Sequence, residues 1–410
     1  MTKPTLAPLK RDERTRFVGS AVTVQRVAIL TTNYYPRPCG VGDHSMRLGQ
    51  ALLRMGADVR VFSSGPAERH PDAPELHVHG VTGAFPLTRL LALVHAIQTW
   101  GANAVIVQYV PRMLGASRFG SPWGPLLAHW MRARDIRVIG IAHELYLPWA
   151  WRPDLALGAA LNRLALLWLF LAVDRLAVTT EPRRLQALEL AGRFGVEGHL
   201  SVLPIGSSAL PVASRSVHGR FNVGVFSTLA HGKRMDVVLK AFERLVGVLP
   251  HARLMLIGDF GEPGNRRRRA LSEKIRDSPA AAHIQLTGRL LLPDVAEAVA
   301  DLDAYLFPMD VGATTRSSTL PLPLGAGVPV IALRGRDTGP LFVADENIVF
   351  ADELTGVAFA DAVLRLIKEP GLAETVSAGG RRLYRDHLDW AVLAGRTLDL
   401  LLGSSRSTQP

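Results

Sequence analysis

Short apolar segments alternate with polar, glycine-containing loops along most of this chain. Stretches with helical spacing of apolar residues separate most of these segments, and a strand–helix alternation predicts a parallel sheet covered on both faces. In the first half the predicted strands are residues 26–30, 58–63, 104–109, 136–142, 176–180 and 200–203. The first half therefore predicts one doubly wound α/β domain.

A second series of the same units follows a change in composition. After Pro204-Ile205-Gly206 the chain reads SSALPVASRSVHGR, which is small, polar and rich in turn formers, as in an interdomain linker. The predicted strands of the second series are residues 222–227, 253–258, 283–288, 304–308 and 328–333. A length of 410 residues also favours two cores over one.

These observations predict the domain limits. We expect a flexible basic tail over 1–23, domains over 24–208 and 209–385, and a disordered tail over 403–410. A helix over 383–402 ends the ordered chain. Residues 386–402 of this helix are candidates to cross back to the first domain.

The loop after the predicted strand 304–308 has the richest set of hydrogen-bond donors. In parallel sheets, ligands bind beyond the carboxyl ends of the strands, where helix N-termini present free N–H groups. Arg316 adds a fixed cation, and this combination suits a phosphate better than a metal or a nucleophile. The hydroxyl donors are Thr314, Thr315, Ser317, Ser318 and Thr319. The alternative is that these hydroxyls only cap a helix.

Two loops in the first half are further candidates. Gly40 and Gly42 permit close approach of the backbone to a ligand, and Asp43 or His44 is a candidate cap for a helix over 45–55. The full G-x-G-x-x-G and G-x-x-x-x-G-K-[ST] patterns are absent, which disfavours a dinucleotide dehydrogenase. His143, directly after strand 136–142, is placed to donate to a hydroxyl, a phosphate or a backbone carbonyl. A purely structural His143 is the alternative.

Charge and cysteine content narrow the classes of partner. The 47 Lys and Arg residues exceed the 36 Asp and Glu residues by 11, which favours an anionic partner. No nucleic-acid motif such as an RRM signature is present, so no nucleic acid is expected, and the basic run 266–269 is interpreted as a solvated helix face. A single cysteine, Cys39, and a charged N-terminus without an apolar core predict a cytoplasmic protein.

An ordered series of motifs resembles a GT-B glycosyltransferase, specifically the retaining glycosyltransferase family four. The motifs are YYPRPCGVGDHSMRLGQALLRMGADVRVF, VIGIAHE, FSTLAHGKRMDVVLKAF, LMLIGDFG, LTGRL and GAGVPVIAL, and they extend over about residues 25–400. The resemblance implies two Rossmann-like doubly wound parallel-sheet domains that face each other across a cleft. It also implies a nucleotide-sugar co-substrate and no metal or other cofactor.

Site residues follow from the matching motifs. Lys233 matches the lysine that binds the donor diphosphate, with Arg234 beside it, and His143 matches the histidine near the donor sugar. The remaining donor-binding positions implied by the motifs are Gly40, Val41, Gly42, Gly258, Arg289 and Leu290.

The donor loop departs from the family pattern. The two glutamates expected there are Thr314 and Leu322, so Asp310 is the nearest carboxylate to replace the first, and Leu322 cannot accept a hydrogen bond from ribose. Pro321 and Pro323 remove backbone donors from the helix start. Arg316 and Arg234 are candidates to supply the missing positive charge, and His143 and Asp310 are the catalytic candidates.

The resemblance implies transfer of a hexosyl group, with retention, to a glycan, lipid-linked or other cell-envelope acceptor. Residues 145–173 carry three tryptophans among aliphatics, which indicates a peripheral contact with the inner face of a membrane or, alternatively, ordinary core packing. Their most apolar part, 164–173, is shorter than the about 20 residues needed to span a bilayer. The rival function is a catalytically degenerate GT-B module that binds a nucleotide, a glycan or a protein, and an epimerase or phosphorylase ranks lower.

Overall fold

The computed structural model describes residues 26–37, 39–81, 86–111, 113, 121–149, 151–195, 199–213, 219–227, 232–260 and 264–403. The predicted tail over 1–23 lies outside these residues, as does the predicted tail over 403–410 except for Gly403. Parts of the loops after two strands of the second series, residues 228–231 and 261–263, also lie outside them.

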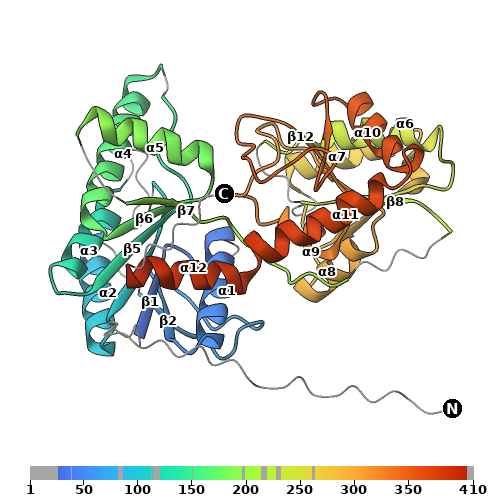
Figure 1. The fold of residues 1–410 in the computed structure, drawn as a ribbon. Helices are drawn as coiled ribbons and strands as arrows, with labels where there is room; N and C mark the ends of the chain where they lie inside the picture. The colour runs from blue at the N-terminus through green and yellow to red at the C-terminus, as the bar shows by residue number, and fades with distance from the viewer. Residues whose placement is uncertain are drawn as a thin grey trace, which may run out of the picture.

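Each half of the chain forms one parallel sheet, so the predicted fold class is confirmed (Figure 1). The first sheet has the order β3-β2-β1-β4-β5-β6-β7. Its strands are β1 (Arg26–Thr31), β2 (Asp58–Ser63), β3 (His77–Gly80), β4 (Ala104–Tyr109), β5 (Arg137–Ala142), β6 (Arg175–Val178) and β7 (Leu200–Val202). The second sheet has the order β10-β9-β8-β11-β12-β13. Its strands are β8 (Asn222–Phe226), β9 (Arg253–Ile257), β10 (Ile284–Gly288), β11 (Ala304–Phe307), β12 (Val330–Leu333) and β13 (Val349–Ala351).

Helices cover both faces of the first sheet. Alternate residues of β1 divide between the two cores: Val27 and Ile29 pack on one face, and Ala28 and Leu30 on the other. One face is covered by α2 (Pro86–Trp100), α3 (Trp123–Arg132), α4 (Pro153–Ala172) and α5 (Glu181–Arg193). The other is covered by α1 (Gly40–Arg54) and by α12 (Trp390–Leu402), the last helix of the described chain.

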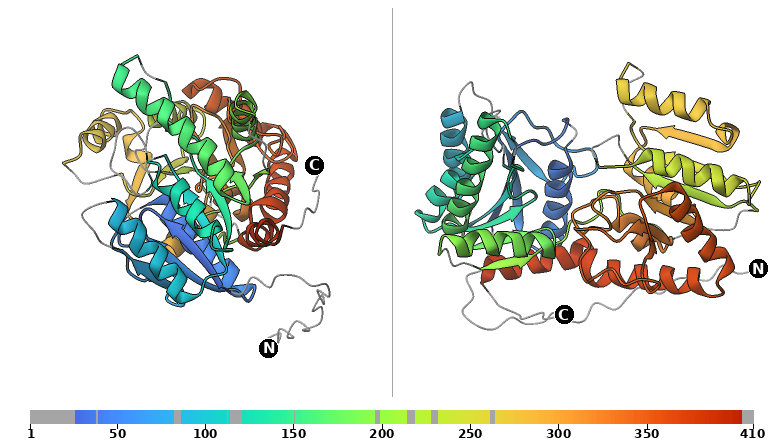
Figure 2. Two further views of the ribbon diagram at one scale, coloured as in Figure 1. Left: turned by 90° about the vertical axis from the view of Figure 1, so that its left-hand side faces the viewer. Right: turned by 90° about the horizontal axis from the view of Figure 1, so that it is seen from above.

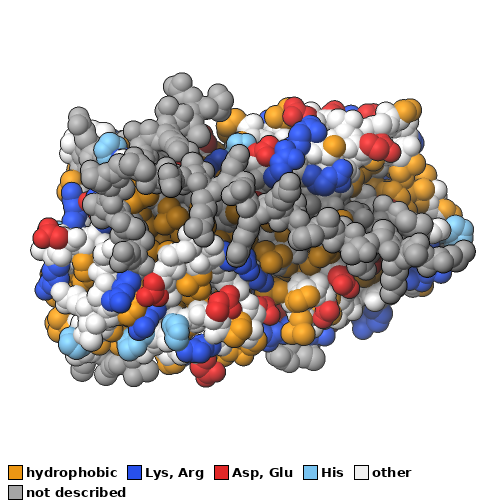
Figure 3. All heavy atoms as spheres, turned by 60° about the horizontal axis from the view of Figure 1, so that its bottom comes forward, with side chains coloured by type: hydrophobic (Ala, Val, Ile, Leu, Met, Phe, Trp, Pro, Cys, Tyr) orange, Lys and Arg blue, Asp and Glu red, His pale blue; other side chains and the backbone are white. Residues whose placement is uncertain are grey.

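The second sheet is covered in the same way. One face packs against α6 (Met235–Val246), α7 (Arg266–Arg276) and α10 (Gly356–Lys368). The other packs against α8 (Leu292–Ala300) and α9 (Pro321–Ala326), and α11 (Leu372–Leu383) contacts α9 and α10. The basic run 266–269 forms the first turn of α7 and is mostly exposed. Lys and Arg side chains are spread over both domains on the lower face of the molecule, with Asp and Glu among them (Figure 3).

The end of the chain passes from the second domain to the first along one side of the molecule (Figures 1 and 2). The single helix predicted over 383–402 is instead two helices. After α11 come a π-helical turn, Tyr384–Leu388, and Asp389, whose side chain caps α12 by accepting from Ala391 N at 2.8 Å. The Trp390 indole then donates to the Ser207 carbonyl at 2.8 Å. The linker after β7 and the returning end of the chain, which both join the two domains, therefore pack against each other.

The structure corrects two local predictions. The first helix begins at Gly40 rather than near residue 45, so the predicted glycine loop is already part of the helix. Cys39 is therefore the N-cap, and neither Asp43 nor His44 caps the helix. The apolar stretch 164–173 belongs to α4, which has 20 residues and is long and apolar enough to cross a membrane by length and composition alone, with 50% of its apolar window buried. Pro153 at the helix start and the small residues after it extend this helix toward its N-terminus.

Candidate active site

The carboxyl ends of strands from both sheets meet at the domain boundary. The loop after β11 is bonded directly to the first domain: the Thr315 hydroxyl donates to the Thr179 carbonyl at 2.6 Å, and Ile205 N donates to the Thr315 carbonyl at 2.8 Å. Thr179 follows β6 and Ile205 follows β7. Ligand-binding positions of the two sheets are therefore brought together, as in other open parallel sheets.

His143 lies at this edge of the first sheet, held on both sides. Its backbone N–H donates to the Tyr109 carbonyl at 3.0 Å, and its Nε2 is 2.6 Å from Gln108 Oε1. The His44 ring lies edge-on to the His143 ring at 5.0 Å and to the Trp390 ring at 5.2 Å. With Gln108 Oε1 as acceptor, His143 carries its proton on Nε2 and presents Nδ1 as an acceptor.

Both histidines are neutral at neutral pH. The pKa of His143 lies well below its ordinary value because burial disfavours the charged ring, and the nearby His44 and Arg183 lower it further. Burial lowers the pKa of His44 to about 4. A neutral imidazole can accept a hydrogen bond from a hydroxyl, whereas an imidazolium cannot.

Several buried polar groups gather at the same edge without a hydrogen-bond partner among the described residues. They come from the loop after β1, from α1, from the end of β4 and from the segments after β6 and β7. The atoms are Thr32 Oγ1, Tyr34 OH, His44 Nδ1, Gln108 Nε2, Tyr109 OH, Thr179 Oγ1 and Ser207 Oγ. Buried polar atoms are normally hydrogen-bonded, so this edge is suited to a ligand with many hydroxyl groups.

Lys233 lies at the corresponding edge of the second sheet. Its loop runs beside the segment after β11, because Arg234 N donates to the Pro308 carbonyl at 2.9 Å and Asp310 N donates to the Gly232 carbonyl at 3.0 Å. Gly232 is required there: its φ is +80°, and an added Cβ would lie 2.9 Å from Asp310 Oδ1. Burial lowers the pKa of Lys233 to about 8. The exposed Arg234 instead pairs with Asp236 at 2.7 Å.

Most polar side chains of the loop between β11 and α9 are buried or already bonded to other residues of the protein. Thr314 is fully buried, Thr315 is bonded to the first domain, and Arg316 Nε lies 3.2 Å from Asp337 Oδ2. The hydroxyls of Ser317 and Thr319 are 3.1 Å apart, and these two residues and Ser318 are half-buried. No side chain caps α9, so the alternative prediction of a helix cap is wrong for this described helix.

The remaining predicted donor residues lie at the same edges. Gly40 and Val41 form the first turn of α1, and an added Cβ on Gly42 would lie 2.9 Å from the Asn33 carbonyl oxygen. Gly258 has φ +122°, and its N–H donates to the Thr287 hydroxyl at 3.2 Å. Arg289 is exposed and Leu290 half-buried, directly after β10. Gly42 and Gly258 therefore have packing reasons for lacking a side chain, beside any contact with a ligand.

Three residues of the site were missed by sequence reasoning: His44, Gln108 and Arg183. Gln108 is the only residue of the buried strand β4 with an amide side chain, and that position was a usable signal. Arg183, in the first turn of α5, donates through Nη1 to the His143 carbonyl. A pattern of strands and helices does not show that this arginine reaches the neighbouring strand end.

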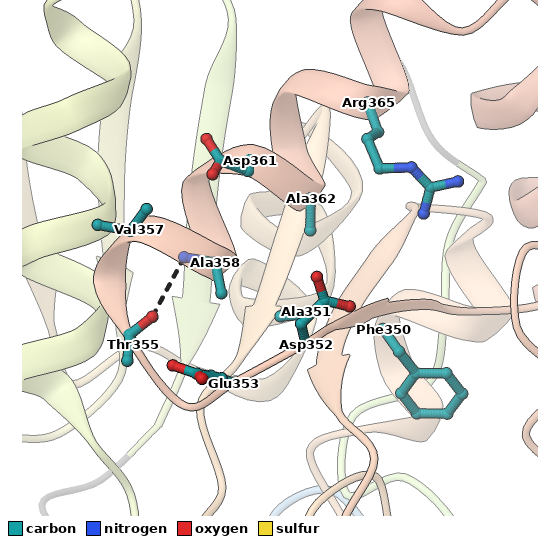
Figure 4. Close-up of a pocket in the computed structure, with 10 residues that line it drawn as sticks. All are labelled: Phe350, Ala351, Asp352, Glu353, Thr355, Val357, Ala358, Asp361, Ala362 and Arg365. Atoms are coloured by element: carbon teal, nitrogen blue, oxygen red, sulfur yellow. Dashed lines mark hydrogen bonds between the residues drawn. The ribbon is translucent and has the colours of Figure 1, made fainter.

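A separate hollow of about 670 Å³ lies on the second domain (Figure 4). It is lined by residues of β13, of α10 and of the turn between them, at the outer edge of the second sheet, and none of the candidate site residues lines it. Its charged lining residues are Asp352, Glu353, Asp361 and Arg365, and Arg365 is paired with Asp345 and Glu369. An acidic hollow of this kind does not suit a diphosphate.

The described residues contain no group of three or more His, Cys, Asp or Glu side chains arranged to hold a metal ion. Asp301 and Asp303 have the Asp-x-Asp spacing, but they lie at the amino end of β11, away from the site. There Asp303 accepts a hydrogen bond from Asn222 N at 2.7 Å.

Comparison with known proteins gives two family matches and a consistent set of structures. Residues 38–206 match the model described as Glycosyltransferase Family 4, and residues 220–369 match the model described as Glycosyl transferases group 1. No curated protein matches the chain.

Among solved structures, sucrose-phosphate synthase (tll1590) from Thermosynechococcus elongatus has a TM-score of 0.69 at 16% identity, covering 93% of this chain and 100% of that one. Anabaena Alr3699/HepE in complex with UDP has a TM-score of 0.69 at 11% identity, with 92% and 99% covered. A mutant of S. aureus TarM has a TM-score of 0.67 at 10% identity, with 92% and 99% covered.

The two sheets, their meeting edges and these matches define the chain as a glycosyltransferase with the GT-B fold. Within that class it resembles glycosyltransferase family four, as the motifs predicted.

Proposed function

We propose that the protein transfers a hexosyl group from a nucleotide-sugar to a hydroxyl of a glycan or lipid-linked cell-envelope acceptor, with retention and without a metal. One observation carries the proposal: half-buried Lys233 lies at the carboxyl edge of one sheet, and buried polar groups without partners among the described residues lie at the carboxyl edge of the other. The similar structures support it, since HepE was solved in complex with UDP and with UDP-glucose, and the TarM mutant in complex with Fondaparinux, alpha-GlcNAc-glycerol and UDP.

In this mechanism Lys233 stabilises the leaving diphosphate. A partly desolvated ammonium interacts with a developing negative charge more strongly than an exposed one does, and it needs no metal beside it. The bond between the anomeric carbon and the diphosphate breaks, and the acceptor oxygen bonds to the same face of that carbon. The departing phosphate oxygen takes the acceptor proton. Neutral His143 accepts a hydrogen bond from a sugar hydroxyl through Nδ1, and Asp310, beside the Lys233 loop, is the nearby carboxylate.

The affinity for UDP is expected to fall as pH rises through about 8, the pKa of free Lys233. Below that pH the lysine is already charged, so the affinity is constant. Above it, binding must first protonate the lysine, which weakens binding by up to about tenfold per pH unit. Isothermal titration between pH 7 and 9 measures this. A Lys233→Ala variant gives the baseline for the titration of UDP itself, and a parallel decline in both proteins would contradict the assignment.

The second candidate function is a GT-B module that binds a nucleotide or glycan without turnover. Thr314 and Leu322, which stand where the family has two glutamates, are fully buried, and Leu322 packs in the core of the second domain. Acceptor-dependent release of nucleoside diphosphate separates the two functions, and NMR of the product anomer tests retention. Nucleotide-sugar binding without any such release would favour the module.

We also propose a peripheral contact between α4 and an anionic bilayer. The helix has an outward apolar stripe, and Trp149 and Trp151 beside its N-terminus are 61% and 104% exposed. Arg163 stacks over the rings of Tyr146 and Trp149 at 4.0 and 4.3 Å, so a cation lies beside the aromatic group. The stripe consists of Leu157, Leu161, Leu164 and Leu171, which are 54%, 42%, 53% and 58% exposed.

In a pelleting assay with phosphatidylglycerol vesicles, Leu161→Asp and Leu164→Asp are each expected to weaken binding by about tenfold or more, because each removes an exposed leucine that the proposed contact buries in the bilayer and adds a negative charge. Val357→Asp on α10, where Val357 is 55% exposed, is the matched control in the other domain. No pelleting of the wild-type protein, or an equal loss in the control, would contradict the contact.

A further inference from the structure

Two arginines from different domains lie on hydrogen-bonded segments at the domain boundary. Arg183 lies in the first turn of α5, where Thr180 caps the helix by accepting from Arg183 N at 3.3 Å. Arg316 follows Thr315, whose hydroxyl donates to the carbonyl of Thr179 at 2.6 Å. The segments that carry the two arginines are therefore bonded to each other. We call Arg183 and Arg316 the arginine pair.

The arginine pair has little close negative charge. Arg316 pairs with Asp337, and the two side chains are only 29% and 13% exposed. Among the described residues no carboxylate forms an ion pair with Arg183, whose Nη1 donates to the neutral carbonyl of His143. Burial lowers the pKa of Arg183, and the neighbouring Arg316 lowers it further, against smaller opposing effects of Asp337, Glu144 and Tyr146. Two half-buried guanidiniums that share one close carboxylate favour the binding of an anion.

The arginine pair lies on other segments than Lys233: Arg183 is on α5 and Arg316 follows Thr315, whereas the loop of Lys233 is bonded to Pro308 and Asp310. Burial lowers the pKa of Lys233, whereas Arg316 contributes to the lowered pKa of Arg183. The sequence-based expectation grouped Arg316 with Lys233 at the leaving diphosphate. The described contacts of Arg316 are instead with Asp337 and, through space, with Arg183.

We propose that the arginine pair binds a phosphate or carboxylate group other than the leaving diphosphate, carried by the acceptor or by the transferred sugar. This assignment rests on the proposed function, in which Lys233 takes the diphosphate. Planar guanidiniums bind phosphate and carboxylate through paired hydrogen bonds. With one guanidinium from each domain, the bound anion receives hydrogen bonds from both domains. Thr179, whose fully buried hydroxyl has no partner among the described residues, lies in the segment bonded to the Arg316 loop and adds a further donor.

The test compares anion binding with nucleotide binding by titration calorimetry at low ionic strength. Inorganic phosphate, glucuronate and UDP are each titrated into the wild-type protein and into Arg183→Gln, Arg316→Gln and Lys233→Ala. Each arginine variant is expected to weaken phosphate or glucuronate by at least tenfold and UDP by less than threefold, and Lys233→Ala to do the reverse. The double arginine variant should bind the anion with an affinity within about twofold of that of the single variants, because each single substitution already disrupts the shared site.

Arg193→Gln is the matched control, since Arg193 is an exposed arginine on the same helix and pairs with Glu189. The proposal is overturned if neither anion binds at millimolar concentration, if Arg193→Gln weakens the anion as much as Arg183→Gln, or if Arg183→Gln weakens UDP as much as the anion. Because the substitutions lie in different domains, misfolding of one leaves the other to decide.

Two further arms identify the source of the anion. UDP-glucuronate binding at least tenfold more tightly than UDP-glucose, with the difference lost in Arg183→Gln, assigns the group to the transferred sugar. Equal binding of the two, with phosphate or glucuronate still bound beside UDP, assigns it to the acceptor. Anion binding without any nucleotide binding would overturn the proposed function and leave the anion site standing.

Discussion

Replacing Lys233 with alanine is expected to lower kcat/KM by about 100- to 1,000-fold, because the variant lacks the half-buried cation that we place at the leaving diphosphate. The loop backbone is expected to keep its position, since it is fixed by hydrogen bonds from Arg234 N and Asp310 N rather than by the lysine side chain. The loss should therefore be in chemistry and donor affinity, with little change in thermal stability. Steady-state kinetics and thermal unfolding of the purified variant measure both.

Lys240→Ala is the matched control for Lys233→Ala. Lys240 lies on α6, in the same segment of the second domain, and it is exposed. Its removal is expected to leave kcat/KM within about threefold of wild type. Turnover by Lys233→Ala within about threefold of wild type would show that the lysine does not stabilise the leaving group.

Replacing His143 with alanine is expected to reduce kcat by about 100-fold, because neutral His143 accepts a hydroxyl hydrogen bond in the proposed mechanism. His129→Ala is the control, since His129 is exposed on α3 and away from the domain boundary. A structural His143 would instead show normal kcat in whatever fraction of the variant folds.

Gln108→Glu distinguishes a catalytic His143 from a structural one, because only a catalytic His143 would change the pH profile of kcat/KM. A carboxylate 2.6 Å from His143 Nε2 stabilises the charged imidazole and raises the pKa of His143. Below the raised pKa the ring is charged and Nδ1 cannot accept. The acid limb of the kcat/KM profile should therefore move to higher pH, with activity regained as pH rises. An unchanged profile would show that Gln108 does not set the protonation of His143.

The apolar pattern predicted most of the fold because the strands are buried on both faces. Each of the eleven predicted strand segments overlaps a strand, and the two missed strands lie at sheet edges. β3 reads His-Val-His-Gly and is largely exposed, and β13 has only three residues, so neither has the apolar run on which the prediction depends. The break at 384–389 was missed because the apolar spacing continues through it, while the cap of Asp389 is a matter of local backbone geometry.

The site was only partly predictable, since its contacts join residues far apart in the chain. His143 and Arg316 could be found because each follows a predicted strand, and strand ends of a parallel sheet share one edge. Lys233 was found because its segment resembles the diphosphate-binding segment of the family. The sequence does not show that the Thr315 hydroxyl donates to the Thr179 carbonyl, or that Arg316 is near enough to Arg183 to affect its pKa. Those facts depend on how the second domain meets the first.

Thermal-shift binding against UDP-, GDP-, ADP- and dTDP-sugars, repeated with Lys233→Ala, tests the central claim most directly. A ligand at 100 times its dissociation constant stabilises the folded protein by about 2.7 kcal/mol, which is well above detection. We expect one nucleotide to stand out and to lose its effect in Lys233→Ala. Folded protein that responds to none of them, or equally with and without Lys233, would contradict the account.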